Sequence, residues 1–549
     1  MKVDRLHIRS RFKNLENVRV DFDEDHLMTV VVGRNGSGKS NVLEALVAIF
    51  RNLDLGEAPP FSYELVYRLG ERHKPNQPST RWLEITIDAD PERGTLAKQY
   101  EVRVHDLLSE NISKDIFDEQ PLGIVIPFSK VKRNKEGKAP YLPNYVFAYY
   151  SGPSDRLEDY FKKHRINFYR RLIKKEENVD LKGDIRPLFY AKPNHSQFVL
   201  LAFFLNEQDS VEKVFLREHL GIESLDSIQF VMRKPAWAKK KSELFWGAYG
   251  VVRRFLDELI KYSLSPVKVT RQEDTSLTGK QIKNEFFHLF LPDVNALREF
   301  SKGLSADELF KMLESTLLSE IISEVSIRVK VSSSKEPLTF RELSEGEQQL
   351  LTVLGLLKFT GGKDSLFLLD EPDTHLNPSW AVKYLKFLRE FVPNHETSHL
   401  LMVTHHPLAI AELKKQQVQV MWRDDEHNVH SQEPYIDPRG AGFMATLTEI
   451  FGLNTTLDLE TQKLLDDRNE LAHIENRTED QNNQLDLLND ELNRLGFSLE
   501  NRDPLYSEFL LAWQDLRYSD KPPLTPDKAA QRRAAMKNVI EALKAKKGC

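Results

Sequence analysis

Three features that are scarce in this chain exclude whole classes of protein. Its single cysteine, Cys549, has no partner for an intrachain disulfide. The longest dense apolar run, residues 198–205, is far shorter than the ~20 residues that a membrane-spanning helix needs. Residues 1–5 are not followed by the apolar core of a secretory signal peptide. We therefore expect a cytoplasmic protein without a membrane segment.

Sustained heptad repeats are also missing. Residues 155–320 show mostly helical patterns, but their apolar residues do not keep the heptad spacing of a coiled coil. We therefore expect an inserted helical lobe over residues 151–324, and not a long coiled-coil arm.

Charge is distributed unevenly along the chain. The formal net charge of the 549 residues is −6, yet residues 521–549 hold eight Lys and Arg side chains against two acids. Prolines 522, 523 and 526 precede a predicted basic helix over residues 527–546. A basic terminus on an acidic body fits a docking element for an acidic partner or nucleic acid, and it also fits a solvated terminal helix.

The other patterns divide the chain into four regions, with boundaries at 1–150, 151–324, 325–430 and 431–549. In the first region, strand patterns occur at residues 82–87, 100–104 and 145–150. Residues 55–80 are rich in Pro, Gly and charge, which predicts a surface insertion. The third region alternates helices with buried strands, and the fourth carries leucines at helical spacing. This order predicts an α/β fold with a C-terminal helical extension.

A phosphate-loop motif, GxxxxGKS, occupies residues 33–40 between an apolar run and a helical pattern. Its glycines let backbone N–H groups turn toward phosphates, Lys39 supplies a positive charge, and the Ser40 hydroxyl suits Mg²⁺. The motif predicts ATP and Mg²⁺ as ligands. The candidate nucleotide contacts are Gly33, Asn35, Gly36, Ser37, Gly38, Lys39, Ser40 and Asn41.

Two acids, Asp370 and Glu371, follow the apolar run 366–369. An acid at the carboxyl end of a buried strand can hold Mg²⁺ opposite Ser40. The next acid can orient or deprotonate the water that attacks the nucleotide. We therefore predict that Ser40 and Asp370 bind the metal and that Glu371 is catalytic.

His405 follows a second apolar run, residues 400–403. A histidine there can donate a hydrogen bond to the terminal phosphate, so we predict a catalytic sensor role for His405. We expect His406 to pack, because no further His or Cys stands at the spacing of a metal site.

The motif Leu-Ser-Glu-Gly-Glu-Gln at residues 343–348 opens a helical stretch. With residues 33–40, 366–371 and His405, it resembles the motif set of ABC-type ATPase heads, which are P-loop NTPases. The resemblance implies that Ser344, Gly346 and Glu347 contact ATP held by a second copy. It also implies a homodimer or a higher even-numbered oligomer, with residues 373–377 crossing the interface. The Ser344 hydroxyl and the first N–H groups of the following helix would form the anion site.

ABC-type heads also carry a glutamine that reaches Mg²⁺ and the water. Gln77 and Gln99 stand at suitable places in the sequence, but neither has the right context. That role stays unassigned.

Three further segments are similar to PtuA-like ATPases of Septu anti-phage systems, a branch of the SMC-like ATPases. They are Tyr-Tyr-Ser-Gly-Pro-Ser-Asp-Arg-Leu-Glu at 149–158, Arg-Pro-Leu-Phe-Tyr at 186–190 and Thr-His-His-Pro at 404–407. The resemblance implies a separate HNH nuclease as partner, with nucleic acid bound through the complex. Because such ATPases also occur beside retrons, a reverse transcriptase with its DNA–RNA hybrid is a further partner that the resemblance allows.

Three functions remain open. The chain is a regulatory ATPase of an anti-phage nuclease complex, an SMC-like DNA-repair ATPase that acts directly on DNA ends, or a scaffold that hydrolyses ATP slowly. The first predicts a tight protein partner and little DNA affinity of its own. The second predicts a salt-dependent DNA affinity in the isolated protein. The acidic body favours the first.

Overall fold

The computed structural model describes most of residues 1–495, and these residues form two units. The described ranges are 1–72, 79–108, 123–134, 137–173, 186–238, 244–274, 281–362, 364–453, 455, 457–474 and 476–495. The larger unit comprises Met1–Val30 and Gly38–Ala409, and the smaller comprises Val31–Ser37 and the chain from Ile410. Each is described by itself. Among the described residues, no helix is long and apolar enough to cross a membrane.

The first sheet of the larger unit is antiparallel, in the order β2-β1-β4-β5-β6-β7. Its strands are β1 (Lys2–Ile8), β2 (Val18–Asp21), β4 (Tyr63–Gly70), β5 (Trp82–Ala89), β6 (Tyr100–Asp106) and β7 (Ile124–Ile126). The strands predicted at 82–87 and 100–104 are therefore confirmed. Two short helices, α2 (Leu96–Gln99) and α3 (Phe128–Val131), lie in its connections.

The prediction of a surface insertion at residues 55–80 is wrong for β4. This strand pairs with both β1 and β5, and Tyr63, Leu65, Tyr67 and Leu69 are buried. The four residues alternate along the strand, as a half-buried strand requires. Prolines and glycines on both sides of β4 hid that alternation in the sequence.

A second sheet holds the core of the larger unit. Its order there is β3-β16-β15-β8-β9, and the pairs among its last four strands are parallel. The strands are β3 (Met28–Gly33), β8 (Tyr145–Tyr150), β9 (Leu188–Tyr190), β15 (Ser365–Asp370) and β16 (Ser398–Val403). β3, β15 and β16 are buried along their whole length, which explains their continuous apolar runs.

The register of the parallel strands places their carboxyl ends together. Asp370 at the end of β15 pairs with Val403 of β16 on one side and Tyr150 of β8 on the other. Residues that follow these three positions therefore gather at one edge of the sheet. This is the edge where open α/β sheets bind ligands.

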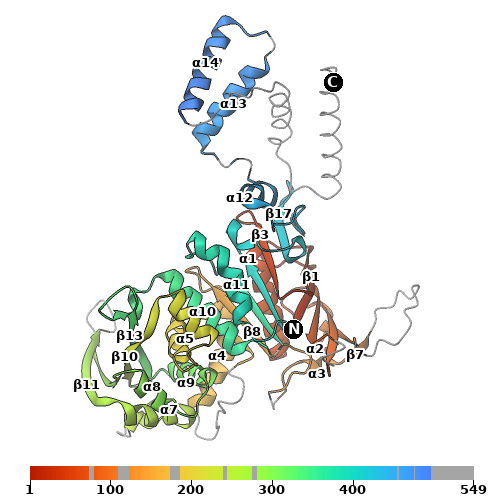
Figure 1. Ribbon diagram of the computed structural model, residues 1–549. Coiled ribbons are helices and arrows are strands. Elements are labelled where there is room, and N and C mark those ends of the chain that lie inside the picture. Colours follow the sequence, from red (N-terminus) through yellow and green to blue (C-terminus); the bar gives the residue numbers. More distant parts are fainter. Residues whose placement is uncertain are drawn as a thin grey trace. The chain divides into compact units, whose positions relative to one another are not determined.

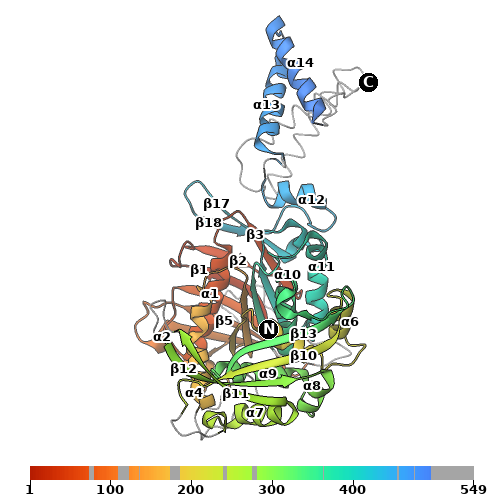
Figure 2. The ribbon, with the colours of Figure 1, turned by 90° about the vertical axis from the view of Figure 1, so that its left-hand side faces the viewer.

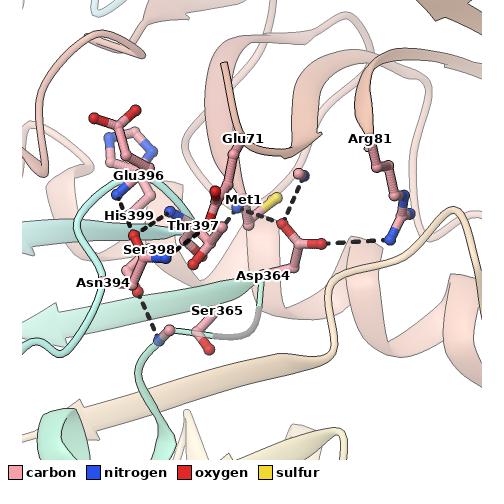
Figure 3. A network of polar contacts seen from close by, with 12 residues as sticks. Met1, Glu71, Arg81, Asp364, Ser365, Asn394, Glu396, Thr397, Ser398 and His399 are labelled. Atoms are coloured by element: carbon pink, nitrogen blue, oxygen red, sulfur yellow. Dashed lines mark hydrogen bonds and ion pairs between the residues drawn. The ribbon is translucent and has the colours of Figure 1, made fainter. Parts of the chain in front are cut away.

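Polar contacts join the amino ends of β15 and β16 to the first sheet (Figure 3). Asp364 Oδ1 accepts hydrogen bonds from the Met1 amino group and the Gly70 N–H, both at 2.8 Å. Arg81 lies 3.5 Å from its other oxygen. The Val3 N–H donates to His399 Nδ1 at 2.9 Å. These contacts connect the starts of β1 and β15, which are more than 360 residues apart in sequence.

Helices pack around the second sheet. They include α1 (Lys39–Leu55), α5 (His195–Phe203), α9 (Ala306–Leu318), α10 (Glu345–Thr360) and α11 (Pro378–Phe391). α5 packs against both α9 and α10 (Figure 1). The approach to α10 is close, because a Cβ on Gly355 would lie 2.2 Å from a Val199 methyl group.

The region predicted as a helical lobe contains helices and a third sheet. The additional helices are α4 (Glu158–Ile173), α6 (Val211–Glu218), α7 (Gly250–Tyr262) and α8 (Val294–Phe300). The sheet has the antiparallel order β11-β12-β10-β13-β14. Its strands are β10 (Ile222–Arg233), β11 (Leu264–Asp274), β12 (Gln281–Leu291), β13 (Ile322–Val331) and β14 (Leu338–Thr339). α7, α8 and α9 lie against it (Figure 2).

The description of residues 151–324 as helical is thus incomplete, and the predicted boundary at 324/325 falls inside β13. Apolar residues do alternate in β10, where Ile228, Phe230 and Met232 are fully buried. Val231 between Phe230 and Met232 is apolar as well, so the alternation is interrupted and was hidden among longer helical patterns.

The smaller unit contains a hairpin of β17 (Val418–Arg423) and β18 (Val429–Gln432), which pair antiparallel. It continues into α12 (Gly442–Ala445), a π-helical turn (Thr446–Ile450), α13 (Leu459–His473) and α14 (Glu479–Arg494). The last two helices form a hairpin in which Arg468 donates to Asn489. The predicted C-terminal helical extension is therefore confirmed for these helices. The predicted basic helix at 527–546 lies outside the described residues.

Candidate functional site

The phosphate loop leads from β3 into α1. Its last residues, Gly38, Lys39, Ser40 and Asn41, belong to the larger unit, and α1 begins at Lys39. Gly38 has a φ of 96°, which side chains rarely adopt, and a Cβ there would lie 2.7 Å from Leu15 Cδ2. The glycine is thus required both by backbone conformation and by space. Lys39 is buried, and this burial lowers its pKa against the attraction of Glu371 and Asp370.

The first part of the loop belongs to the smaller unit. Gly33 has a φ of 146°, and a Cβ on it would lie 2.1 Å from the Met421 carbonyl oxygen. Arg34, Asn35 and Gly36 are exposed. Ser37 is buried, and its hydroxyl makes no hydrogen bond within the described residues. A buried hydroxyl without a partner in a phosphate loop is a group that a ligand can satisfy.

Ser40 and Asp370 come together as predicted, although they are 330 positions apart. The Ser40 hydroxyl donates to Asp370 Oδ1 at 2.9 Å. The other oxygen, Oδ2, accepts from Arg156 at 3.1 Å. Burial raises the pKa of Asp370 to about 6, although Ser40 and Arg156 both act to lower it. The arrangement offers two oxygen ligands at the end of the phosphate loop.

Glu371 has a strained backbone and an accessible side chain. Its φ is 52°, a left-handed conformation that a glutamate seldom adopts. The conformation is held by hydrogen bonds from its own N–H to Val403 O at 2.8 Å and from Gln349 to its carbonyl oxygen. The side chain is 31% exposed and pairs with His405 Nδ1 at 3.2 Å. The Glu371 carboxylate is therefore partly exposed and lies beside His405.

His405 and His406 differ in their surroundings. The His405 side chain is 53% exposed and faces Glu371. The His406 backbone N–H donates to Thr404 Oγ1, and its Nδ1 accepts from the Leu408 N–H. His406 therefore contributes hydrogen bonds to the local structure, while His405 lies at the surface beside Glu371.

The segment after Glu371 is anchored by buried groups. Both oxygens of Asp373 accept from Thr404 Oγ1, at 3.0 and 2.7 Å, and burial raises the pKa of this aspartate. Asn377 caps α11 by accepting from the Trp380 N–H. Residues 373–377 are thus held in a defined shape between β15 and α11.

The Leu-Ser-Glu-Gly-Glu motif forms the start of α10. Ser344 is the N-cap, and its hydroxyl and N–H both contact Glu347 Oε2, at 2.9 and 2.7 Å. Gly346 packs on the segment after Glu371, since a Cβ there would lie 2.5 Å from His375 O. Glu345 and His375 form an exposed ion pair at 3.5 Å. The start of α10 and residues 373–377 therefore lie side by side, with Glu345 and His375 exposed.

Arg156 and Glu44 are residues of this site that the sequence analysis missed. Arg156 lies between β8 and α4 and reaches Asp370, while Glu44 stands one turn after Ser40 on α1. Glu44 is 1% exposed and pairs with Lys13. Glu44 could have been noticed in the sequence only as an acid within the helix that follows the phosphate loop. Arg156 stands in the segment 149–158 that resembles PtuA-like ATPases, but nothing in that segment assigned it to the metal site.

Of the two glutamines considered for the unassigned role, Gln77 lies outside the described residues, and the hydrogen bonds of Gln99 within them do not reach the site. Gln99 donates to the carbonyl oxygens of Pro91 and Gly94, within the connection between β5 and β6. Ser151 instead follows β8 beside Asp370, and its hydroxyl lies 3.1 Å from that of Thr374.

Within the described residues, no three His, Cys, Asp or Glu side chains gather as a metal-binding cluster. This result is compatible with Mg²⁺, which is usually held by one or two protein oxygens together with phosphates and water. The Ser40 hydroxyl and the Asp370 carboxylate are hard oxygen donors that fit this pattern.

The family comparison matches residues 1–410 to the model of the AAA ATPase domain (AAA_15). Among curated proteins, the Septu protein PtuA of Bacillus mycoides (strain KBAB4) is 25% identical over 195 residues, or 33% of this chain and 27% of that protein. The Septu protein PtuA of Bacillus thuringiensis is 23% identical over 228 residues, or 36% of this chain and 57% of that protein. The chain thus spans about a quarter and somewhat over half of these relatives.

Solved structures that resemble the chain include two SMC heads. One is an SMC head bound to the C-winged helix domain of ScpA, with 13% identity and a TM-score of 0.31 over 79% of this chain and 97% of that one. The other is the SMC head domain from Thermotoga maritima, with 12% identity and a TM-score of 0.30 over 79% of this chain and 99% of that one.

Proposed function

Because the chain belongs to the family of AAA ATPase domains and is an ATPase, we propose that it is the regulatory subunit of a Septu-like anti-phage defence complex. In this role it hydrolyses ATP in the cytoplasm and controls a separate HNH-type nuclease. The observation that carries the proposed chemistry is the meeting of Ser40 with Asp370, next to Lys39 and Glu371.

The phosphates of ATP would lie along residues 33–40. Backbone N–H groups around Gly36 and Gly38 would bind oxygens, and the first turn of α1 would add its favourable partial charge. Lys39 would neutralise the outer phosphates. Asn41, which bonds Asn14 from the β1–β2 connection, would hold the loop beside the nucleotide.

Ser40 and Asp370 would hold Mg²⁺. When bound, this ion neutralises charge that develops on the phosphates during transfer. Asp370 is kept close to Ser40 by their hydrogen bond, so the two ligands are arranged before the ion arrives.

Glu371 would accept a proton from the attacking water. Its carboxylate is partly exposed, and His405 Nδ1 lies 3.2 Å from Oε1. His405 would then report on the terminal phosphate, because it can exchange its bond with Glu371 for one to a phosphate oxygen.

A second copy would complete the site. The start of α10 lies against residues 373–377 through Gly346, and its N-cap residue Ser344 is exposed. We propose that the hydroxyl of Ser344 and the N–H groups near Gly346 and Glu347 bind the terminal phosphate held by the other copy. ATP would then hold two heads together.

Two variants test the ATP-dependent pairing. Glu371→Gln should bind ATP and stay paired, while turnover falls about 10²-fold or more, the scale of a lost general base. Ser344→Arg should bind ATP but remain single, because the bulky cation blocks the surface. Sizing chromatography with ATP and Mg²⁺ measures both, and Ser334→Arg, an exposed serine in a turn, is the matched control. Equal pairing of the Glu371 and Ser344 variants would show that Ser344 does not act on a second copy.

The region from residue 431 onward is proposed to hold the nuclease. Deleting residues 524–549 should leave ATP turnover near normal and remove the HNH partner from co-purified complexes. Retained partner binding would move the docking surface to α13 and α14 or to residues 151–324. In a retron-linked system, the reverse transcriptase and its DNA–RNA hybrid should co-purify as well.

The defence role is tested in cells that carry the gene with its neighbouring nuclease gene. Lys39→Ala and Glu371→Gln should each abolish protection in phage plaque assays at unchanged protein levels. Direct DNA-end processing would instead give the isolated chain a DNA affinity that falls steeply with salt. A strong affinity of this kind, with no nuclease partner, would overturn the proposal.

A further inference from the structure

The Arg156 side chain lies between two carboxylates that belong to different elements. Its Nη2 is 3.1 Å from Asp370 Oδ2, and its Nε is 3.9 Å from Glu44 Oε1. The guanidinium also stacks over the Tyr150 ring, 5.1 Å from the ring centre. The arginine is thus held in place beside the proposed cation site.

The carboxylate of Asp370 is shared between two donors. Oδ1 accepts from Ser40, and Oδ2 accepts from Arg156. A divalent cation that binds at Ser40 and Asp370 must meet the positive charge of the guanidinium on the same carboxylate. At such short range the two cations compete for Asp370.

Glu44 is a second carboxylate with which Arg156 can pair. Its side chain is 1% exposed, and Lys13 contacts only one of its oxygens, Oε2. The other oxygen, Oε1, and the Nε of Arg156 are both buried without a hydrogen bond in the described residues. A small shift would close the 3.9 Å gap between them. Buried groups without hydrogen bonds are costly, so a new bond between Arg156 and Glu44 would partly offset the loss of the bond between Arg156 and Asp370.

We propose, on the basis of the proposed ATP site, that Arg156 is a positioning residue that occupies the cation site in place of the metal. It holds the Asp370 carboxylate beside Ser40 before the metal binds. A divalent cation displaces it, and Arg156 then pairs with Glu44. The arginine therefore sets how much Mg²⁺ the site requires.

The test measures how much Mg²⁺ is needed for binding, and it does not depend on turnover. A fluorescent, non-hydrolysable ATP analogue is titrated with Mg²⁺, and the half-saturating Mg²⁺ concentration is recorded. Arg156→Gln should lower this concentration about threefold, the scale of a partly exposed ion pair. Glu44→Gln should raise it, because Arg156 then has no second carboxylate to pair with and keeps only a neutral acceptor.

The double variant separates this mechanism from general damage. With Arg156→Gln already present, Glu44→Gln should have no further effect on the Mg²⁺ requirement. Arg165→Gln is the matched control, because Arg165 is 36% exposed against 34% for Arg156 and pairs with Glu158 away from Asp370. It should leave the Mg²⁺ requirement unchanged, and melting curves identify any variant that is not folded.

Each outcome bears on a different claim. If the wild-type chain binds the analogue with Mg²⁺, but Arg156→Gln raises the requirement or leaves it unchanged, the displacement mechanism is wrong. Additive effects of the two substitutions would also overturn it. If the wild-type chain shows no Mg²⁺-dependent binding, the proposed ATP site itself is wrong, and the inference falls with it.

Discussion

β15 and β16 have charged groups at both of their ends, and the two ends are built differently. At the amino end, both oxygens of Asp364 have partners, and His399 lies between the Val3 N–H and the Thr29 hydroxyl. At the carboxyl end, Glu44 Oε1 and Arg156 Nε face each other, and neither has a hydrogen-bond partner among the described residues. At the amino end, the Thr397 hydroxyl is also buried without a partner among them, but no second unpaired charged group faces it.

Backbone strain follows the same division. Asp364 and Glu371 both have left-handed backbones, with φ of 50° and 52°. Aspartate tolerates this conformation, because its short side chain can bond locally, but glutamate does not. The amino end is therefore consistent with a structural role, while the carboxyl end carries a strained glutamate and two facing charged groups with unmade hydrogen bonds, Glu44 and Arg156, where a ligand is proposed.

The largest effect on stability should come from removing the Asp364 carboxylate at the amino end of β15. Asp364→Ala leaves the Met1 amino group, the Gly70 N–H and Arg81 without their shared acceptor. We expect the free energy of unfolding to fall by about 3–5 kcal/mol, as when one partner of a buried pair is removed. Denaturant unfolding measures the change. Asp25→Ala, which breaks an exposed ion pair with Arg72, should change it by about 1 kcal/mol or less.

Asp364→Asn refines this prediction. Asparagine keeps an acceptor and tolerates the left-handed backbone, so it should lose less than alanine. If alanine and asparagine at residue 364 were both as stable as the wild type, the amino end would have no structural importance and the contrast between the two ends would disappear.

A change at the carboxyl end should act on ligand binding and leave the fold intact. Lys39→Ala removes the point charge that faces the phosphates, so affinity for ATP with Mg²⁺ should fall about 10- to 100-fold. Isothermal titration measures the affinity. The melting temperature without nucleotide should stay close to that of the wild type, and unchanged affinity in a folded variant would refute the site.

The buried Lys2 should make the stability of the fold depend on pH. Burial lowers the pKa of Lys2 to about 8, so between pH 8 and about 10.5 the unfolded chain binds more protons. Stability therefore rises with pH across this window. Lys2→Met should raise stability by on the order of 1 kcal/mol at pH 7, because the removed charge penalty outweighs the lost bond to His26 O.

The advantage of Lys2→Met should shrink as pH rises from 8 to 10, when the wild-type lysine loses its proton. Melting curves over that range measure it. An advantage that stays constant with pH would mean that the buried charge is not its cause.

The smallest effect concerns strain at Glu371. Asparagine tolerates φ near 52° better than glutamate or glutamine. The free energy of unfolding of Glu371→Asn should therefore exceed that of Glu371→Gln by up to about 1 kcal/mol. Both lack the carboxylate and should have lost turnover. Equal stability of the two variants would show that no strain is stored at this position.

Short motifs were predictable because their chemistry is local. Gly38 and Lys39 stand together in the chain, and a buried strand that ends in Asp370 and Glu371 can be recognised from six residues. The strands of the first sheet at 82–87 and 100–104 were recognised for the same reason. β4 and β10 were missed, since turn residues or polar neighbours masked their alternation.

The sequence by itself determined the class of the protein: an α/β ATPase with a phosphate loop, an acid pair and a helical extension, because these depend on spacing within a few residues. Only the tertiary structure decided which distant side chains share a carboxylate. Arg156 and Glu44 meet near Asp370 because β8 and β15 lie side by side in register and α1 starts beside them. No spacing along the chain encodes that meeting, since it depends on strand order and on helix packing.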